Sequence, residues 1–134
     1  MADGTAYPVK EILRRSMRQF EYFYGHQAEQ FVFYRIPKAL FTDKRFSGIS
    51  YGAKLLYGLM LDRMSLSRKE GWMDKQNKVY IYFTLDEISE QLQCAKQKAG
   101  NLIAELDGRG IGLIETKRQG LGKPNIIYVK NFTT

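Results

Sequence analysis

The sequence predicts an α+β domain of the winged helix-turn-helix type, with short strands, a C-terminal β-hairpin wing and an amphipathic helix in front of it. Three observations lead to this prediction. Two short segments with helical spacing of apolar residues follow each other closely at 85–107. Two strand-like segments with an exposed loop between them come directly afterwards. The length of 134 residues suits one compact domain and a short arm.

Composition and charge narrow the class of protein. Hydrophobic residues make up 44% of the chain, which is enough for a core, and 21 Lys and Arg against 14 Asp and Glu leave a net charge of +7. Such a surplus indicates a polyanionic partner, nucleic acid before membrane. We expect a cytoplasmic protein, because Cys94 is the single cysteine, no apolar run could span a membrane and the N-terminus does not resemble a signal peptide.

The first 30 residues are predicted to form an arm. Leu13, Met17, Phe20 and Tyr24 recur at helical spacing, which predicts an amphipathic helix over about residues 10–24. Two interpretations of this helix stay open. It either packs on its own domain, or it pairs with a second chain or docks on DNA.

The main domain is predicted to span residues 31–134. It opens with a short strand at 31–36, where FVFYRI is rich in aromatic and β-branched residues. Ser50 is a good N-cap for a long helix that runs to about Ser67. The expected core-facing side of this helix consists of Tyr51, Leu55, Leu56, Leu59, Met60 and Met64.

The helix-turn-helix is predicted from local signals. A polar turn at 74–78 leads into a half-buried strand at 79–84, where apolar and polar residues alternate. Thr84 and Glu87 have the spacing of a capping box, so a short helix should follow Thr84. A second helix begins near Ala95 after only two or three residues, and glycines end it.

The wing is predicted directly after the second helix. Strand-like segments at 111–117 and 126–132 enclose the loop RQGLGKPN, whose two glycines and proline suit an exposed loop. The last 42 residues carry seven Lys and Arg against three Asp and Glu. More than half of the net positive charge therefore lies in less than a third of the chain.

Amide and cationic side chains are concentrated in the first turns of the second helix. In a recognition helix, these N-terminal turns are the part that enters the major groove of DNA. Asn and Gln can bind adenine through two hydrogen bonds, and Lys can reach O6 and N7 of guanine. Basic wing residues can hold phosphates or enter the minor groove. The alternative is an ordinary solvated surface. The candidate DNA-binding residues are Lys96, Gln97, Lys98 and Asn101 in the helix, and Lys117, Arg118, Gln119, Lys123 and Asn125 in the wing.

From Phe31 to Phe132 the sequence resembles the N-terminal domain of the RepA_N-type plasmid replication initiators. The matching runs, in family order, are FYRIPKALF, AKLLYGLMLDRMSLS, GWMD, VYIYFT and LIETKRQGLGKPNIIYVKNF. The resemblance implies binding of double-stranded DNA at repeated origin sites (iterons), usually as a homodimer. It also implies that host replication proteins are recruited by a C-terminal domain. These 134 residues do not contain that domain, so we expect a shortened chain or a short relative.

Other classes of function are less well supported. We expect no enzyme, cofactor or metal site, because His26 and Cys94 are the only histidine and cysteine and GLGKP lacks the spacing of a phosphate-binding loop. A transcriptional repressor on the same fold would show the same residues, whereas the basic wing disfavours a protein-interaction module. Tyr34, Phe41 or the helix at 10–24 could each line a dimer interface.

Overall fold

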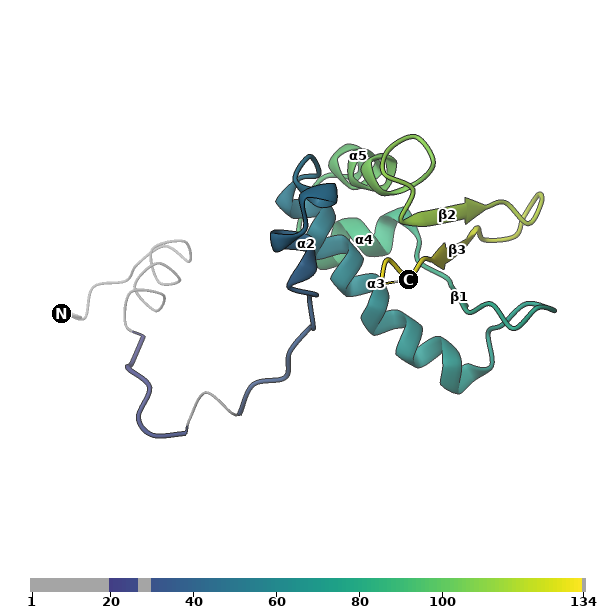
Figure 1. Ribbon diagram of the computed structural model, residues 1–134. Coiled ribbons are helices and arrows are strands. Elements are labelled where there is room, and N and C mark those ends of the chain that lie inside the picture. Colours follow the sequence, from purple (N-terminus) through teal and green to yellow (C-terminus); the bar gives the residue numbers. More distant parts are fainter. Residues whose placement is uncertain (1–19, 27–29, 134) are drawn as a thin grey trace, which may run out of the picture. The chain divides into compact units, whose positions relative to one another are not determined.

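The computed structural model describes residues 20–26 and 30–133. The chain divides into two units, residues 1–33 and 34–134, and the second holds all the elements named below (Figure 1). In chain order these are α2 (Ala39–Thr42), the short 3-10 helix η2 (Lys44–Phe46), α3 (Tyr51–Glu70), β1 (Tyr80–Ile81), α4 (Leu85–Leu92), α5 (Lys96–Leu106), β2 (Ile114–Lys117) and β3 (Ile126–Val129).

The three strands form one antiparallel sheet with the order β1-β3-β2. β2 and β3 are the two arms of the hairpin after α5, with Ile114 opposite Val129 and Lys117 opposite Ile126. β1 adds to the other edge of β3, with Tyr80 opposite Tyr128. A helix, a strand, two close helices and a hairpin therefore follow one another, which is the order of the predicted winged helix.

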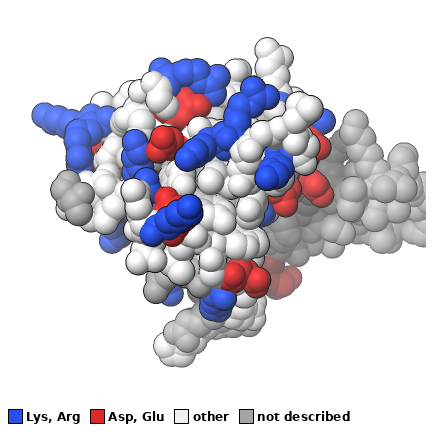
Figure 2. Space-filling model, turned by 90° about the vertical axis from the view of Figure 1, so that its right-hand side faces the viewer, with Lys and Arg blue, Asp and Glu red and all other residues white. Residues whose placement is uncertain are grey.

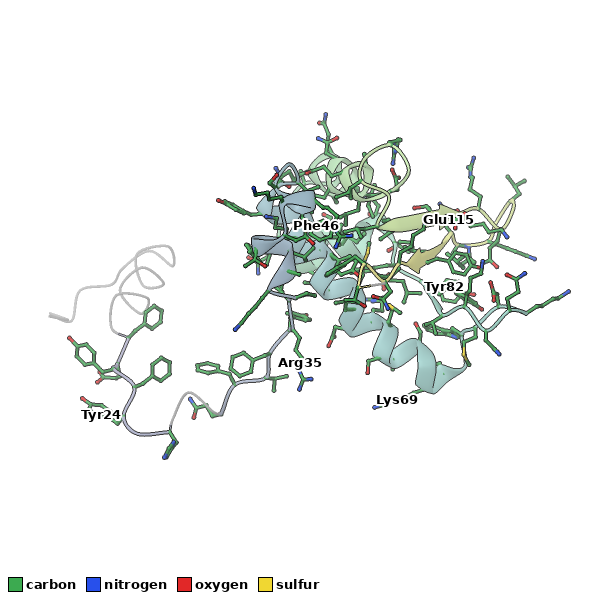
Figure 3. All side chains as sticks on the ribbon, viewed as in Figure 1. Tyr24, Arg35, Phe46, Lys69, Tyr82 and Glu115 are labelled. Atoms are coloured by element: carbon green, nitrogen blue, oxygen red, sulfur yellow. The ribbon has the colours of Figure 1, made fainter. Side chains whose placement is uncertain are left out.

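The core lies between the helices and one face of the sheet. α3 contributes Leu56 and Met60, and the other elements add buried apolar side chains: Leu40, Phe46, Ile81, Ile88, Leu102, Leu106, Ile114 and Ile127. Near the end of the chain, Phe132 contacts the ring of Phe46 edge-on at a centroid distance of 4.9 Å (Figure 3 labels Phe46). This contact fixes the chain that leaves the wing against the core.

The start of α3 is tied to α5. As predicted, Ser50 caps α3, because its Oγ accepts a hydrogen bond from the amide of Ala53 at 3.2 Å. The Glu105 carboxylate on α5 accepts two more, from the Ser50 amide and the Ser50 hydroxyl, each at 2.7 Å. The side of α5 that carries Glu105 is therefore held against the main helix.

The helix-turn-helix forms as the local signals predicted. Thr84 Oγ1 accepts from the Glu87 amide at 3.1 Å, and the Thr84 amide donates to Glu87 Oε1 at 2.9 Å, so both halves of the capping box are present. α4 ends at Leu92, and the next residue, Gln93, caps it with a left-handed φ of 54°. α5 then begins at Lys96, after an Ala95 that has no side chain to cap it.

The predicted strand at 31–36 is wrong. These residues have no regular secondary structure, none of the described residues pairs with them as a strand, and residues 31–35 are exposed. Ile36 instead packs on α3 at Gly58, where a Cβ atom would lie 2.8 Å from Ile36 Cγ1. A preference for strands becomes a strand only where a neighbouring strand provides hydrogen bonds and packing.

The predicted N-terminal helix of residues 10–24 is wrong in its last part, and the rest of it lies outside the described residues. Residues 20–24 are not helical. Helices in proteins gain most of their stability by burying an apolar face, and the aromatic side chains of this segment stay exposed: Phe20, Tyr22, Phe23 and Tyr24.

Other boundaries moved as well. α3 runs three residues past the expected Ser67, to Glu70. Its buried side is rotated, so that Tyr51 and Leu55 are exposed while Ala53 and Tyr57 are buried. The Tyr57 hydroxyl donates to the Lys130 carbonyl at 2.6 Å, which draws this side toward the end of the wing. The strands within 79–84, 111–117 and 126–132 are all shorter than predicted.

Candidate nucleic-acid interface

The exposed side of α5 carries the residues predicted to read DNA. Ala99, Leu102 and Leu106 are buried and fix the orientation of the helix. Gln97 and Asn101 are four residues apart, so they share one face, and both are exposed. Lys98, which lies next to this face, is exposed too. Polar side chains therefore face solvent along the first turns of α5.

Lys96 differs from the other three candidates on α5. Its Nζ lies 2.8 Å from Asp86 Oδ1 in the first turn of α4. The hydrogen bond and the charge of Asp86 raise the pKa of Lys96 above its ordinary value. Since both side chains are largely exposed, this ion pair is weak. Lys96 can exchange this ion pair for a contact with DNA, but without DNA its ammonium group is bound to Asp86.

The wing loop is closed by its own hydrogen bonds. The Gln119 side chain donates to the Pro124 carbonyl at 2.9 Å, and the Lys123 amide donates to the Gly120 carbonyl at 3.2 Å. Gly120 and Gly122 have φ values of 125° and 77°, which favour glycine. Gln119 therefore shapes the loop, while the basic side chains of Lys117, Arg118 and Lys123 are exposed.

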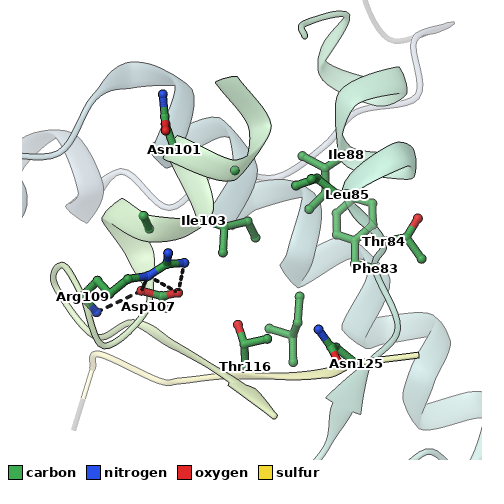
Figure 4. Close-up of a pocket in the computed structure, with 13 residues that line it drawn as sticks. Phe83, Thr84, Leu85, Ile88, Asn101, Ile103, Asp107, Arg109, Thr116 and Asn125 are labelled. Atoms are coloured by element: carbon green, nitrogen blue, oxygen red, sulfur yellow. Dashed lines mark hydrogen bonds and ion pairs between the residues drawn. The ribbon is translucent and has the colours of Figure 1, made fainter. Parts of the chain in front are cut away.

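A hollow of about 560 Å³ lies between α4, α5 and the hairpin. Its apolar part includes Phe83, Ile88 and Ile103. Asn101 on α5 and Asn125, the residue before β3, both border it, on opposite sides in Figure 4. The fold therefore brings one residue of each predicted set, Asn101 from the helix and Asn125 from the wing, to the rim of one concave surface.

Arg109 is a candidate that the sequence prediction did not single out. It borders the same hollow, and its side chain is 68% exposed. The buried carboxylate of Asp107 accepts two hydrogen bonds from Arg109, from Nη2 at 2.7 Å and from the backbone amide at 2.9 Å (Figure 4). These hydrogen bonds from Arg109 lower the pKa of the Asp107 carboxyl. The pair of an acid and a base two residues apart, just past the helix end, was the available signal.

Two other kinds of site are absent from the described residues. Among them, no helix combines the length and apolar character needed to cross a membrane. Within the same residues, no group of three or more His, Cys, Asp or Glu side chains is placed to hold a metal ion. Figure 2 shows Lys and Arg side chains at several places on the side of the molecule from which the wing projects.

Comparisons with known proteins agree with this fold. The family model for the replication initiator protein A (RepA) N-terminus matches residues 32–134. The "41 kDa protein" of Lactobacillus helveticus is 33% identical over 94 residues, or 70% of this chain. The matched part is 26% of that protein, so the chain spans about a quarter of the length of this relative.

Three solved structures are similar throughout the domain. "N-Terminal domain of DNA binding protein" has a TM-score of 0.68 and 33% identity, and the match covers 84% of this chain and 85% of that one. "Structure of Rep-DNA complex" has a TM-score of 0.68 and 32% identity over 83% and 84% of the two chains. "Structure of MDR initiator" has a TM-score of 0.65 and 27% identity over 83% and 86%.

These matches confirm the predicted winged-helix fold and the resemblance found in the sequence. The matched region contains α2 through β3, and with them the helix-turn-helix and the wing. The family model also covers well over half of the chain. The chain therefore belongs to the family of replication initiator protein A N-terminal domains.

Proposed function

We propose that this chain binds double-stranded DNA in a sequence-specific manner at repeated sites of a plasmid replication origin, as the N-terminal domain of a replication initiator. The observation that carries the proposal is the polar face of α5 beside a basic wing, in a chain of this family. The similarity to a solved structure described as a Rep-DNA complex supports it.

In the proposed mechanism α5 lies in the major groove. Gln97 and Asn101 would form hydrogen bonds with base edges, and Lys98 would reach guanine acceptors or a phosphate. The wing would hold the backbone beside that groove through Lys117, Arg118 and Lys123. Binding then needs no catalytic step and no cofactor, and we propose that the chain is not an enzyme.

Two partners belong to the proposal at the level of the whole initiator. We propose a homodimer, because a two-fold axis would place two recognition helices on the two inverted half-sites of one origin site. Host replication proteins would be recruited by a further region of a longer initiator. The L. helveticus relative extends well beyond the matched 26% of its length and so has room for such a region.

The test is fluorescence anisotropy with a labelled duplex that contains the origin repeats and with a scrambled duplex, across a salt series. We expect the repeat duplex to bind about a thousandfold more tightly or better. Equal and steeply salt-dependent binding to both duplexes would contradict sequence reading by α5. Absence of binding to either would overturn the proposal as a whole.

A single substitution tests the reading helix. Gln97→Ala should cost about 1–3 kcal/mol on the repeat duplex, because the base contacts of the amide are lost, and much less on the scrambled one. Gln91→Ala is the matched control, since Gln91 is an exposed glutamine on α4. Equal losses on both duplexes for Gln97→Ala would show that this residue does not read bases.

A further inference from the structure

The turn Asp74–Lys78 lies beside the strands of the wing. It connects Met73 and Val79, which form an isolated antiparallel bridge, and it continues into β1. With residues of β2 and β3 the turn encloses a hollow of about 470 Å³. The turn and the wing loop project from the same side of the molecule (Figure 1). The residues around this hollow are Asp74, Lys75, Gln76, Lys78, Glu115, Lys117 and Tyr128.

Asp74 fixes the shape of the turn from inside. Its Oδ1 accepts from the amides of Gln76 at 2.8 Å and Lys78 at 2.9 Å, and its Oδ2 accepts from the Tyr128 hydroxyl at 3.0 Å. These hydrogen bonds, that from the Lys78 amide first, lower the pKa of the Asp74 carboxyl. Asn77 adopts a left-handed φ of 66°. The turn is therefore ordered before any ligand binds, which reduces the entropy cost of binding.

The lysines of the turn face outward while its carboxylate faces inward. The Asp74 side chain is 22% exposed, against 58% for Lys78. Lys75 is exposed at the tip of the turn, and among the described residues it has no ion-pair partner. The Lys78 Nζ is 3.8 Å from Asp74 Oδ2 and 5.0 Å from the Tyr128 ring centroid, so it is held loosely. Both ammonium groups can reach an anion without breaking the turn.

A row of aromatic side chains in contact with one another lies next to the turn and ends at Tyr128, whose hydroxyl binds Asp74. Trp72 contacts Tyr82 edge-on at a centroid distance of 5.0 Å, Tyr82 contacts Tyr80 at 5.6 Å, and Tyr80 contacts Tyr128 at 6.2 Å. In Figure 3, Tyr82 and Glu115 of β2 lie on the side of the molecule that carries the turn. The turn is therefore a firm projection, and its position relative to the wing is set by the pairing of β1 with β3.

We propose that the Asp74–Lys78 turn is a second DNA-contacting finger, in which Lys75 and Lys78 bind backbone phosphates next to those held by the wing. The inference rests on the proposed function and extends the interface beyond α5 and the wing. Two projections on one side, each bearing exposed lysines, would present positive charge to the phosphates of one duplex. Phosphate contacts of this kind add affinity and fix the register of the protein without reading sequence.

The experiment measures how the logarithm of the binding constant falls with the logarithm of salt concentration. Lys75→Ala and Lys78→Ala are each expected to reduce this slope by about one unit, and to weaken binding to repeat and scrambled duplexes alike. Lys123→Ala in the wing should give the same change. Lys75→Arg should keep the wild-type slope. Lys44→Ala is the matched control, an exposed lysine of η2, and should leave the slope unchanged.

The outcomes separate the two proposals. If the wild-type chain does not bind duplex DNA, the proposed function fails. If it binds and Lys123→Ala lowers the slope, but Lys75→Ala and Lys78→Ala behave like Lys44→Ala, only the second finger is overturned.

Thermal unfolding of each variant should match the wild type, since the exchanged side chains are exposed. A duplex shortened on the side of the turn should bind wild type and Lys75→Ala equally. A persisting difference would contradict a phosphate contact there.

Discussion

Gly100 lies in the middle of α5, and no heavy atom of another part of the chain is within 4 Å of the position its Cβ would occupy. Glycine inside a helix is less stable than alanine because the unfolded chain loses more freedom. Gly100→Ala should therefore raise the free energy of unfolding by about 0.5–1 kcal/mol. Urea unfolding measures this change directly.

Gly110 provides the contrasting control. A Cβ there would overlap the carbonyl oxygen of Glu105, which belongs to the backbone and cannot move aside cheaply. Gly110→Ala should therefore lower the free energy of unfolding. If Gly100→Ala lowered it as well, an unrecognised packing constraint on the exposed side of α5 would have to exist.

At the level of single residues, the sequence predicted which side chains are exposed better than it predicted which residues they contact. All nine candidate DNA-binding residues are exposed, as expected for polar side chains on amphipathic elements. The ion pair of Lys96 with Asp86 depends on the angle between α4 and α5, which no local pattern gives. The position of Arg109 at the rim of the hollow likewise depends on the path of the chain between α5 and β2.

Among the elements, α4 depends on a capping box that satisfies amides at its first turn. Thr84→Ala removes the acceptor for the Glu87 amide and should cost about 1 kcal/mol of unfolding free energy. Thr84→Ser keeps the hydroxyl and should restore most of that loss, which urea unfolding can measure. If the serine variant were as unstable as the alanine variant, the Thr84 methyl group and not the cap would stabilise this helix.

The elements also show why the prediction succeeded for α4 and α5 and failed for the segment 31–36. Helices α4 and α5 are specified by local features, the cap and the apolar spacing, and they formed within one residue of the expected bounds. The segment 31–36 has strand-forming residues but no strand beside it. Strand formation is a property of a pair of segments, so composition alone predicted it wrongly.

At the scale of the whole molecule, the sheet decides which surfaces lie together. β1 has only two residues, yet its pairing with β3 brings the turn Asp74–Lys78 beside β2. The sequence predicted both the turn and the wing as separate features. The turn and the wing lie next to each other because of the strand order β1-β3-β2, in which the first strand pairs with the last. This long-range pairing could not be inferred from local spacing.

The whole molecule should lose stability in acid, because several carboxyl groups are bound by donors in the folded state. Hydrogen bonds to neighbouring donors lower the pKa values of Asp43, Asp74, Glu87 and Asp107. In the unfolded chain these groups return to ordinary values of about 4. The folded state thus binds fewer protons, so its stability is present above about pH 4 and is lost as the pH falls through the folded values.

Urea unfolding at pH values between about 7 and 3 tests this expectation, with a flat free energy of unfolding above about pH 5 and a steady fall below about pH 4. Asp107→Asn removes one of the titrating groups and should make the fall shallower, because its carboxyl is buried and held by Arg109. Glu90→Gln is the matched control, since Glu90 is an exposed carboxylate of α4. A free energy of unfolding that stayed constant down to pH 3 would show that these bound carboxylates do not stabilise the fold.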